Sequence, residues 1–577
     1  MSVLASRKPA RRPARRSPYG SLGRAAGLSA VLIGTGTALG FARDLVLAHR
    51  FGASSSTDAF LVSWTIPETV SPLLIEDAMA LIMVPAVTRM IPRPQGVRTL
   101  VRTTLPRLAL ALALMAITVA AAAPLLVSVL APGLADPAPA VRCVRWTAVT
   151  IVAFGLAGFM NATLRAHHCF GPPASIYMAY NIGILTSIIA LAAPLGITSA
   201  AIGVACGSVL MVLVQVPAFT RRLRGSAREA ADAGEAGTAL GAPAPDTAPA
   251  AAPAAASDAP APDAARLSVA AILPIIVYTL TRQAQVLVER FLGSGLAAGS
   301  ISHLNYAQKV AQVPMVLSLL IVTVTFPRLA RASAERDTRQ IRYRIEADLV
   351  IVSGLVLCAV AYLTACAPAI VQVLFQHGNF TAADTASTSS VLRVYSLGLW
   401  GQAMLGVAAR ALFARSQPLW QPTLAVAAGL AVTVATGALL VGSAGTIALA
   451  AGNAAGITLA AVLLLAGVRA RVVRISLARV GADLLRLAAA TAAAAAAGSA
   501  AAAALPPAVP PLLVLVAGAG AVVSVFAAVL AVTGRGHGTP LGLRALGAPD
   551  PDPASDRPAP DDPATGPAGD AAPGRQL

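Results

Sequence analysis

Two long apolar stretches near the N-terminus decide the fold, namely LGRAAGLSAVLIGTGTALGFARDLVLAH (residues 22–49) and TDAFLVSWTIPETVSPLLIEDAMALIMVPAVTRM (residues 57–90). Each is longer than the ~20 apolar residues that an α-helix needs to cross a bilayer. The first is also too long for the apolar core of a cleavable signal peptide, and it contains Arg43 and Asp44. We therefore interpret it as a retained first membrane helix, followed by a second.

The composition of the whole chain agrees with this interpretation. Of its 577 residues, 56% are hydrophobic and 12% are charged, and the charged share is about half that of a typical globular protein. The mean hydropathy is +0.73. These values exclude a soluble enzyme, a disordered scaffold and a fibrous protein, and they predict an all-α polytopic membrane protein.

Apolar segments of spanning length recur along the chain, and we count fourteen of them. The expected spans are residues 22–49, 57–90, 104–131, 144–166, 174–194, 198–220, 267–291, 300–330, 347–375, 384–415, 421–441, 445–468, 484–505 and 510–533. They predict two lobes of six helices each, followed by two extra C-terminal helices.

Basic residues in the short loops predict the orientation. If the N-terminus is cytoplasmic, every inside loop carries Arg, while the outside loops near residues 196, 443 and 507 carry no charge. We therefore expect both termini in the cytoplasm. The basic residues behind the net charge of +18 then serve to orient the membrane helices. We therefore expect no nucleic-acid partner.

Three segments are too polar, or too poor in large apolar residues, to belong to the bundle. We expect a basic cytoplasmic arm at residues 1–21, a disordered Ala/Pro-rich linker at 223–266 and a disordered tail at 534–577. The remaining domains are a first lobe at 22–222, a second lobe at 267–468 and a final helix pair at 469–533.

The sequence contains no pattern typical of an enzyme or a metal centre. The five cysteines stand singly, and neither a CxxC pair, a phosphate loop nor an HExxH motif occurs. We expect no catalytic residue, cofactor or metal. Thr381 and Asp384 have the spacing of a capping box, which is a structural feature.

Ionisable residues inside membrane spans are costly and often functional. Only two of the 43 basic residues are lysines, and one of them, Lys309, lies within the span 300–330. A rise of ~1.5 Å per residue places Lys309 roughly 14 Å from the start of that span, near the middle of the bilayer. Gln312 follows one turn later. Lys309 is thus a candidate ligand for an anionic substrate, the alternative being a lysine that extends to the interface.

For two arginines and four acids in the spans, more than one interpretation stays open. Arg43 and Asp44 are either cavity residues or a solvated pair at the outer interface. Arg282 either lines a cavity or pairs with a carboxylate such as Glu289. The acids of the second span either form a cation path, neutralise Arg43 and Lys309, or form structural ion pairs. These acids are Glu68, Glu76 and Asp77.

Three stretches resemble the lipid II flippases of the MviN/MurJ type, in the multidrug/oligosaccharidyl-lipid/polysaccharide exporter superfamily. They are GFARDLVLAHRFGASSSTDAFLVSWTIPE (Gly40 to Glu68), LLIEDAMALIMVPAV (Leu73 to Val87) and LFQHGNFTAADT (Leu374 to Thr385). The resemblance implies two six-helix lobes around a central cavity that opens alternately to the two sides. It also implies a groove for the polyprenyl tail at the last two helices, and cavity arginines that bind the pyrophosphate.

The resemblance is carried over residue by residue. Arg43 matches a cavity arginine, Asp58 the aspartate at the start of the second helix, and Glu76 an acid of that helix, while Lys309 stands at a cavity arginine. The chain departs from the family at Thr37, at Ser71 or Pro72 and at Gln312, where the family has two arginines and an acid. Some members bind sodium through Asn and Asp of the eleventh helix, but residues 421–441 contain neither.

These inferences predict a flippase that moves undecaprenyl-pyrophosphate-linked peptidoglycan precursor across a bacterial inner membrane. Two alternatives stay open: export of a different polyprenyl-linked glycan or amphiphile, and a non-transporting scaffold whose tails recruit cell-wall synthesis proteins. The expected partners are an anionic lipid-linked substrate and membrane lipids. The predicted substrate-binding residues are Arg43, Arg282, Lys309 and Gln312. The predicted gating or coupling residues are Asp44, Asp58, Glu76 and Asp77.

Overall fold

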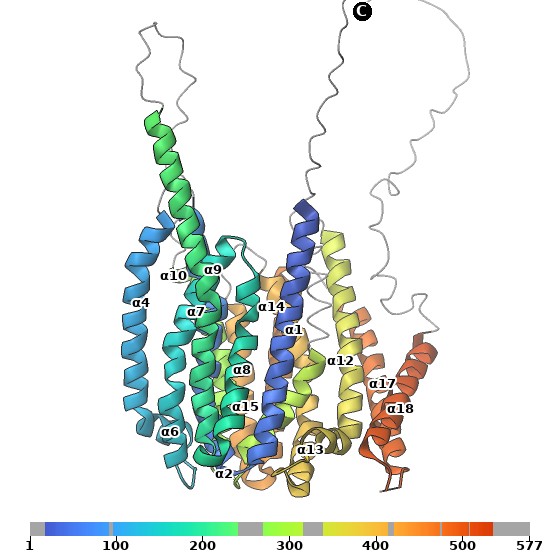
Figure 1. The fold of residues 1–577 in the computed structure, drawn as a ribbon. Helices are drawn as coiled ribbons and strands as arrows, with labels where there is room; N and C mark the ends of the chain where they lie inside the picture. The colour runs from blue at the N-terminus through green and yellow to red at the C-terminus, as the bar shows by residue number, and fades with distance from the viewer. Residues whose placement is uncertain are drawn as a thin grey trace, which may run out of the picture.

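The computed structural model describes residues 18–91, 96–239, 269–315, 338–413, 420–472, 476–506 and 508–534. Within these ranges the chain forms helices and no strand, so the all-α prediction is confirmed. Figure 1 shows the helices running side by side as one bundle. Most of the expected arm, and the expected tail from residue 535 onward, lie outside the described ranges.

The first lobe is built from α1 to α9, with a short π-helical segment, η1. Their bounds are α1 Pro18–Phe51, α2 Ser55–Ser71, η1 Pro72–Asp77, α3 Ala78–Met90, α4 Gly96–Ala121, α5 Ala123–Leu130, α6 Ala138–Thr147, α7 Val149–Ala166, α8 Gly171–Leu195 and α9 Thr198–Ala239. Helix α8 packs against α9 and α1, and α7 packs against α9, α3 and α4. An apolar core that includes Phe60, Phe154 and Ile184 fills this lobe.

The second lobe contains the helical residues 300–315 and six further helices, and the last two helices pack onto it. Their bounds are α10 Val269–Gly293, α12 Thr338–Phe375, α13 Ala382–Ser396, α14 Leu399–Phe413, α15 Gln421–Ala444, α16 Thr446–Arg471, α17 Leu477–Ala503 and α18 Pro511–Gly534. Both α17 and α18 contact α12, and one apolar core runs from the second lobe to Leu487 and Phe526. In Figure 1 this pair forms one edge of the bundle and α4 the other.

Ten helical stretches of the described chain are long and apolar enough to cross a membrane. They coincide with ten of the fourteen expected spans. The other four expected spans also fall on helix, but these helices are broken, carry charges or are described only in part. They are 57–90 (α2, η1 and α3), 267–291 (α10), 300–330 (helical over 300–315) and 384–415 (α13 and α14).

The second span contains two prolines, which lack a backbone N–H: Pro67 lies inside α2, and α2 ends before Pro72. Pro67 offers no donor to the carbonyl of Ser63, which instead accepts the hydroxyl of Thr147 at 3.3 Å. Pro72 opens the π-helical segment and offers no donor to the carbonyl of Glu68. That carbonyl accepts the side-chain amide of Gln283, from α10 in the other lobe, at 2.6 Å. The break in this helix therefore creates a contact between the lobes.

The expected linker begins as helix. Helix α9 continues to Ala239, whereas the linker was expected from residue 223. Ala is the commonest residue of this stretch and has the highest helix propensity even without apolar packing. The rest of the expected linker, residues 240–266, lies outside the described chain.

Candidate functional site

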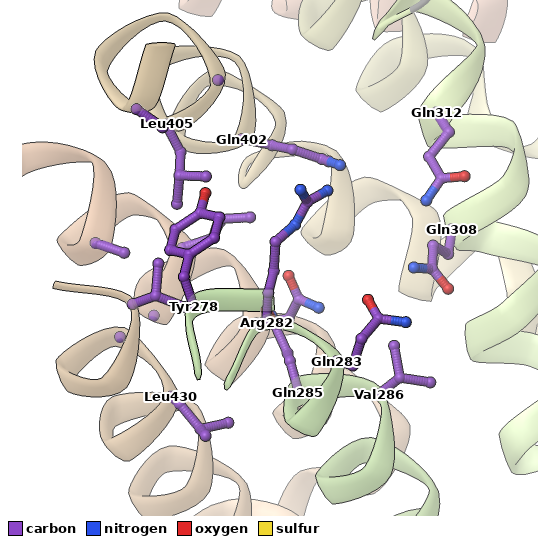
Figure 2. A pocket seen from close by; sticks show the side chains of 18 of the residues that line it. Tyr278, Arg282, Gln283, Gln285, Val286, Gln308, Gln312, Gln402, Leu405 and Leu430 are labelled. Atoms are coloured by element: carbon purple, nitrogen blue, oxygen red, sulfur yellow. The ribbon is translucent and has the colours of Figure 1, made fainter. Parts of the chain in front are cut away.

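A cavity of ≈ 360 Å³ lies mainly within the second lobe. Side chains from α10, residues 300–315, α13, α14, α15 and α16 surround it, and Glu68 of α2 contributes from the first lobe. Figure 2 shows Arg282 and Gln283 on α10, with Gln308 and Gln312 on one neighbouring helix and Gln402 on another. Each of the four broken or charged spans supplies lining residues.

Two of the predicted substrate-binding residues, Arg282 and Gln312, line this larger cavity. The side chain of Arg282 is exposed, and no described residue forms an ion pair with it. Its suggested partner, Glu289, is buried and accepts a hydrogen bond from the amide of Asn453 on α16. Among the described residues no ion pair joins Arg282 to Glu289, so the structure favours the alternative in which Arg282 lines a cavity.

The other two predicted substrate-binding residues are Arg43 and Lys309. They line a second and much smaller cavity of ≈ 10 Å³ between the lobes. This volume is about the minimum that holds one water molecule. Asp44, Trp64 and Asn305 also line it. The structure thus brings together a cation from each lobe, Arg43 from α1 and Lys309 from residues 300–315.

Arg43 is held in place by the first lobe. Its guanidinium donates to Asp44 Oδ1 at 2.7 Å and 3.0 Å and to Asn181 Oδ1 at 3.3 Å, and it lies 4.5 Å from the ring centre of Trp64. Asp44 is 4% exposed, so this pair is buried within the bundle and the solvated interfacial pair is excluded. Lys309 has no hydrogen bond or ion pair with any described residue.

A partly buried ion pair that the sequence did not predict joins the lobes. Arg290 of α10 donates to Glu68 Oε2 at 2.6 Å and also to the carbonyl of Leu61 and the hydroxyl of Thr65. Glu68 is therefore neutralised by Arg290, and not by Arg43 or Lys309. The signal in the sequence was a charged residue in an apolar helix, but its partner lies 222 residues earlier in the chain.

At one end of the bundle the lobes meet in a network that we name the Asp58 junction, formed by Gly52, Asp58, Gly299, Ser302 and Asn379. Asp58 accepts hydrogen bonds from the N–H groups of Gly299, at 2.7 Å, and Ser302, at 2.8 Å. Its Oδ1 also accepts the Ser302 hydroxyl at 2.6 Å. Nearby, the amide of Asn379 donates to the carbonyl of Arg50 at 2.6 Å. The two lobes are closed against each other at this end.

The other predicted gating acids have different surroundings. Glu76 is exposed and accepts the hydroxyl of Tyr177 on α8 at 2.6 Å, a contact within the first lobe. Asp77 is the last residue of η1, and its side chain lies outside the described part. The predicted capping box is confirmed, since Thr381 and Asp384 exchange backbone-to-side-chain hydrogen bonds at the start of α13. Among the described residues no group of three His, Cys, Asp or Glu is arranged to hold a metal.

Two helical lobes with polar side chains enclosed between and within them define a multi-pass membrane transporter, and solved structures share this fold. A structure described as "Lipid II flippase MurJ, inward closed conformation" covers 88% of this chain and 99% of its own, with a TM-score of 0.69 and 18% identity. An inward-facing multidrug transporter of the MATE family and MOP superfamily covers 78% of this chain and 95% of its own, with a TM-score of 0.57 and 12% identity.

Sequence comparison gives the particular family. A family model described as lipid II flippase MurJ matches residues 47–510, so the chain belongs to the lipid II flippase MurJ family. The lipid II flippase MurJ of Burkholderia cenocepacia is 25% identical over 386 residues, which are 65% of this chain and 70% of that protein. A probable lipid II flippase MurJ of Helicobacter pylori is 33% identical over 129 residues, 22% of this chain and 28% of that protein.

Proposed function

We propose that this chain translocates lipid II, the undecaprenyl-pyrophosphate-linked precursor of peptidoglycan, from the inner to the outer leaflet of the bacterial plasma membrane. Membership of the lipid II flippase MurJ family supports the substrate and the direction. The observation that carries the proposal is the meeting of Arg43 and Lys309, one from each lobe, at a shared cavity in the interior. Asp44 neutralises Arg43 at this cavity, so Lys309 is left as an uncompensated cation, which is costly within a membrane protein unless an anion binds there.

The pyrophosphate is the part of the substrate that these cations would hold. Arg43 is oriented by Asp44 and Trp64, and a fixed guanidinium matches the geometry of phosphate oxygens. Lys309 contributes an ammonium that no described residue neutralises, and Arg282 adds a third cation at the larger cavity. The cavity between Arg43 and Lys309 is small in this conformation, so the lobes have to separate for the pyrophosphate to enter.

Alternating access would use the Asp58 junction as one gate. With both termini in the cytoplasm, the α1–α2 turn faces outward, so this conformation is closed on the outer side. Opening the outer side requires Asp58 to release Gly299 and Ser302. We assign Asp58 to gating and Asp44 to the orientation of Arg43. Glu76 and Asp77 are proposed coupling residues on η1, where the broken helix gives the first lobe a place to bend.

The small number of uncompensated cations also supports a second candidate function, transport of a different polyprenyl-linked glycan. Two arginines inside the bundle are already neutralised within the protein, Arg43 by Asp44 and Arg290 by Glu68. The positions where the resemblance expects two further arginines hold Thr37 and either Ser71 or Pro72. A cargo with a less charged head group would fit this reduced cationic set.

Depletion of the native lipid II flippase in a bacterial host that expresses this chain distinguishes the two candidates. The measurement is the fraction of lipid II that an outer-leaflet probe reaches, with membrane insertion of the chain confirmed separately. Restored exposure supports lipid II transport. Absent exposure from an inserted chain contradicts it and favours the second cargo.

A further inference from the structure

We infer that the Asp58 junction is sensitive to protons: protonation of His303 from the outer side of the membrane holds the two lobes closed at that end. The inference rests on the alternating access in the proposed function, but not on its cargo. It is based on the position of one histidine near two carboxylates, of which one belongs to each lobe.

His303 is held in place within the second lobe. It follows Ser302 at the start of helical residues 300–315, and its Nε2 lies 3.2 Å from Oδ1 of Asp384 on α13. The other oxygen of Asp384 accepts the N–H and the hydroxyl of Thr381, which fixes the carboxylate. The side chains of His303 and Asp384 are 12% and 15% exposed, so protons from the outer side can reach them. Both the neutral and the charged imidazole can donate to Asp384, so the ring keeps its position in either form.

Asp58 of the first lobe is the second carboxylate near His303. It is 4% exposed and accepts hydrogen bonds from Gly299 and Ser302, but it forms no ion pair with any described residue. A positive charge on His303 attracts this carboxylate. Because Asp58 is buried, little water lies around it to screen the attraction.

Only one of the two interactions of His303 changes when the outer side opens. Asp384 belongs to the same lobe as His303 and moves with it, whereas Asp58 belongs to the other lobe and moves away. A proton on His303 is therefore attracted by Asp58 in the closed conformation alone. By linkage, that proton favours the closed conformation by the same free energy. Histidine is the side chain that ordinarily changes its charge between about pH 5 and pH 8, so the junction should respond in this range.

The other titratable groups at this end cannot produce the same response. Protonation of Asp58 or Asp384 removes the charge that the hydrogen bonds and His303 act on, so it favours opening. A tyrosine such as Tyr306 stays neutral in this range. The side chains of His49 and His377 are exposed, so water and salt screen their charges. The titratable and charged groups around His303 and the junction are Asp44, His49 and Arg50 of α1, Asp58 of α2, Tyr306, His377 and Asp384.

The test measures the conformation of the outer side in the purified full chain in detergent, without substrate. Spin labels on cysteines at positions 135 and 443 report the distance between the lobes by pulsed electron paramagnetic resonance, in a chain without its native cysteines. Both positions are exposed and lie at the outer end of the bundle, one in each lobe. Between about pH 8 and about pH 6 we expect the ratio of closed to open conformers to rise roughly fivefold, the low end of typical coupling between two sites.

Two variants assign the response to His303. His303→Gln can still donate to Asp384 but cannot gain a proton, so it should match the parent chain near pH 8 and lose the rise on acidification. Asp384→Asn keeps an acceptor for Thr381 but removes a charge that favours the protonated histidine, so it should move the response to lower pH. This second variant retains His303 and tests the inference even if His303→Gln does not fold. His377→Gln, at an exposed histidine of the same outer face, is the matched control and should keep the full response.

Three outcomes overturn the inference: a rise that persists in His303→Gln, a rise that His377→Gln abolishes as well, or a closed fraction of the parent chain that is constant or falls on acidification. A fall would mean that protonation of the carboxylates decides the conformation. Since the labels need no substrate, the test is separate from that of the cargo. The expected response in a chain that fails to expose lipid II supports the proton-sensitive junction and contradicts the proposed cargo, and lipid II exposure without the response does the reverse.

Discussion

Asp58 and Ser302 join the two lobes through a helix terminus. The Asp58 carboxylate accepts both the N–H of Ser302, at 2.8 Å, and its hydroxyl, at 2.6 Å, while Gly299 N–H donates to the second oxygen. These N–H groups belong to the start of helical residues 300–315, so an acid of the first lobe caps a helix of the second. Free N–H groups and the helix dipole both favour a carboxylate at this position.

Replacement of Asp58 should therefore open the junction. Hydrogen bonds to a charged group contribute about 1.5–3 kcal/mol each, so Asp58→Ala should reduce the ratio of closed to open conformers by about tenfold or more. The measurement is the yield of a short bifunctional cross-link between cysteines at positions 50 and 379, in a chain without its native cysteines. Asp136→Ala, in an exposed loop of the first lobe, should keep the full yield. An unchanged yield in Asp58→Ala would show that Asp58 does not hold the gate.

Gly378 should be required for a second contact of the closed junction. Its φ is +63°, and an added Cβ would lie against the carbonyl of His49 in the other lobe. Gly445 has a similar φ of +55°, but no atom lies close to an added Cβ there. Gly445→Ala therefore measures the effect of backbone strain without a steric clash. We expect Gly378→Ala to lower the cross-link yield and Gly445→Ala to leave it unchanged. Equal effects of the two substitutions would mean that the contact between lobes is unimportant.

Glu68 and the buried Arg290 should behave as a coupled pair. Removal of one partner leaves an uncompensated charge and costs about 3–5 kcal/mol, whereas replacement of both by apolar groups is often nearly neutral. We expect Arg290→Leu and Glu68→Leu each to lower the thermal unfolding temperature in detergent, and the double variant to recover most of the loss. Additive losses in the double variant would show that the two side chains are not coupled.

Lys309 should be required for its charge. Since no described residue neutralises it, Lys309→Ala should abolish lipid II exposure in depleted cells, while Lys309→Arg keeps a cation there and should retain activity. The loss for Lys309→Ala should appear with normal membrane insertion, which is assayed by protease protection of the loops. Equal activity of the two variants would remove Lys309 from the binding site.

The helical framework could be predicted from the sequence because membrane insertion depends on local apolarity. Each of the fourteen expected spans coincides with helix in the described chain. The capping box at Thr381 was also predictable from local sequence, because it depends only on two residues three positions apart. The extension of α9 to Ala239 was missed, because low apolarity argues against a span but not against an Ala-rich helix.

The site was predictable in part. Lys309 stood out as a lone cation within a span, and the structure places Arg43 at the same cavity. Arg290 was overlooked, because its role depends on Glu68, Leu61 and Thr65 in a distant helix. Apart from Gln312, the carboxamides of the larger cavity were overlooked as well. Glutamine in a span is weakly polar when taken alone, and only tertiary packing brings six amides from several helices to one cavity.

The central claim is that this chain moves lipid II by means of the cations that converge from its two lobes. The most direct measurement reconstitutes the purified chain into liposomes that carry lipid II in both leaflets. A membrane-impermeant enzyme added outside then cleaves the accessible lipid II. We predict that wild-type liposomes lose nearly all of their lipid II, and that those with Lys309→Ala keep the inner-leaflet half. Cleavage that stops at half with the wild-type chain, under conditions in which an established flippase drives it to completion, would contradict the claim.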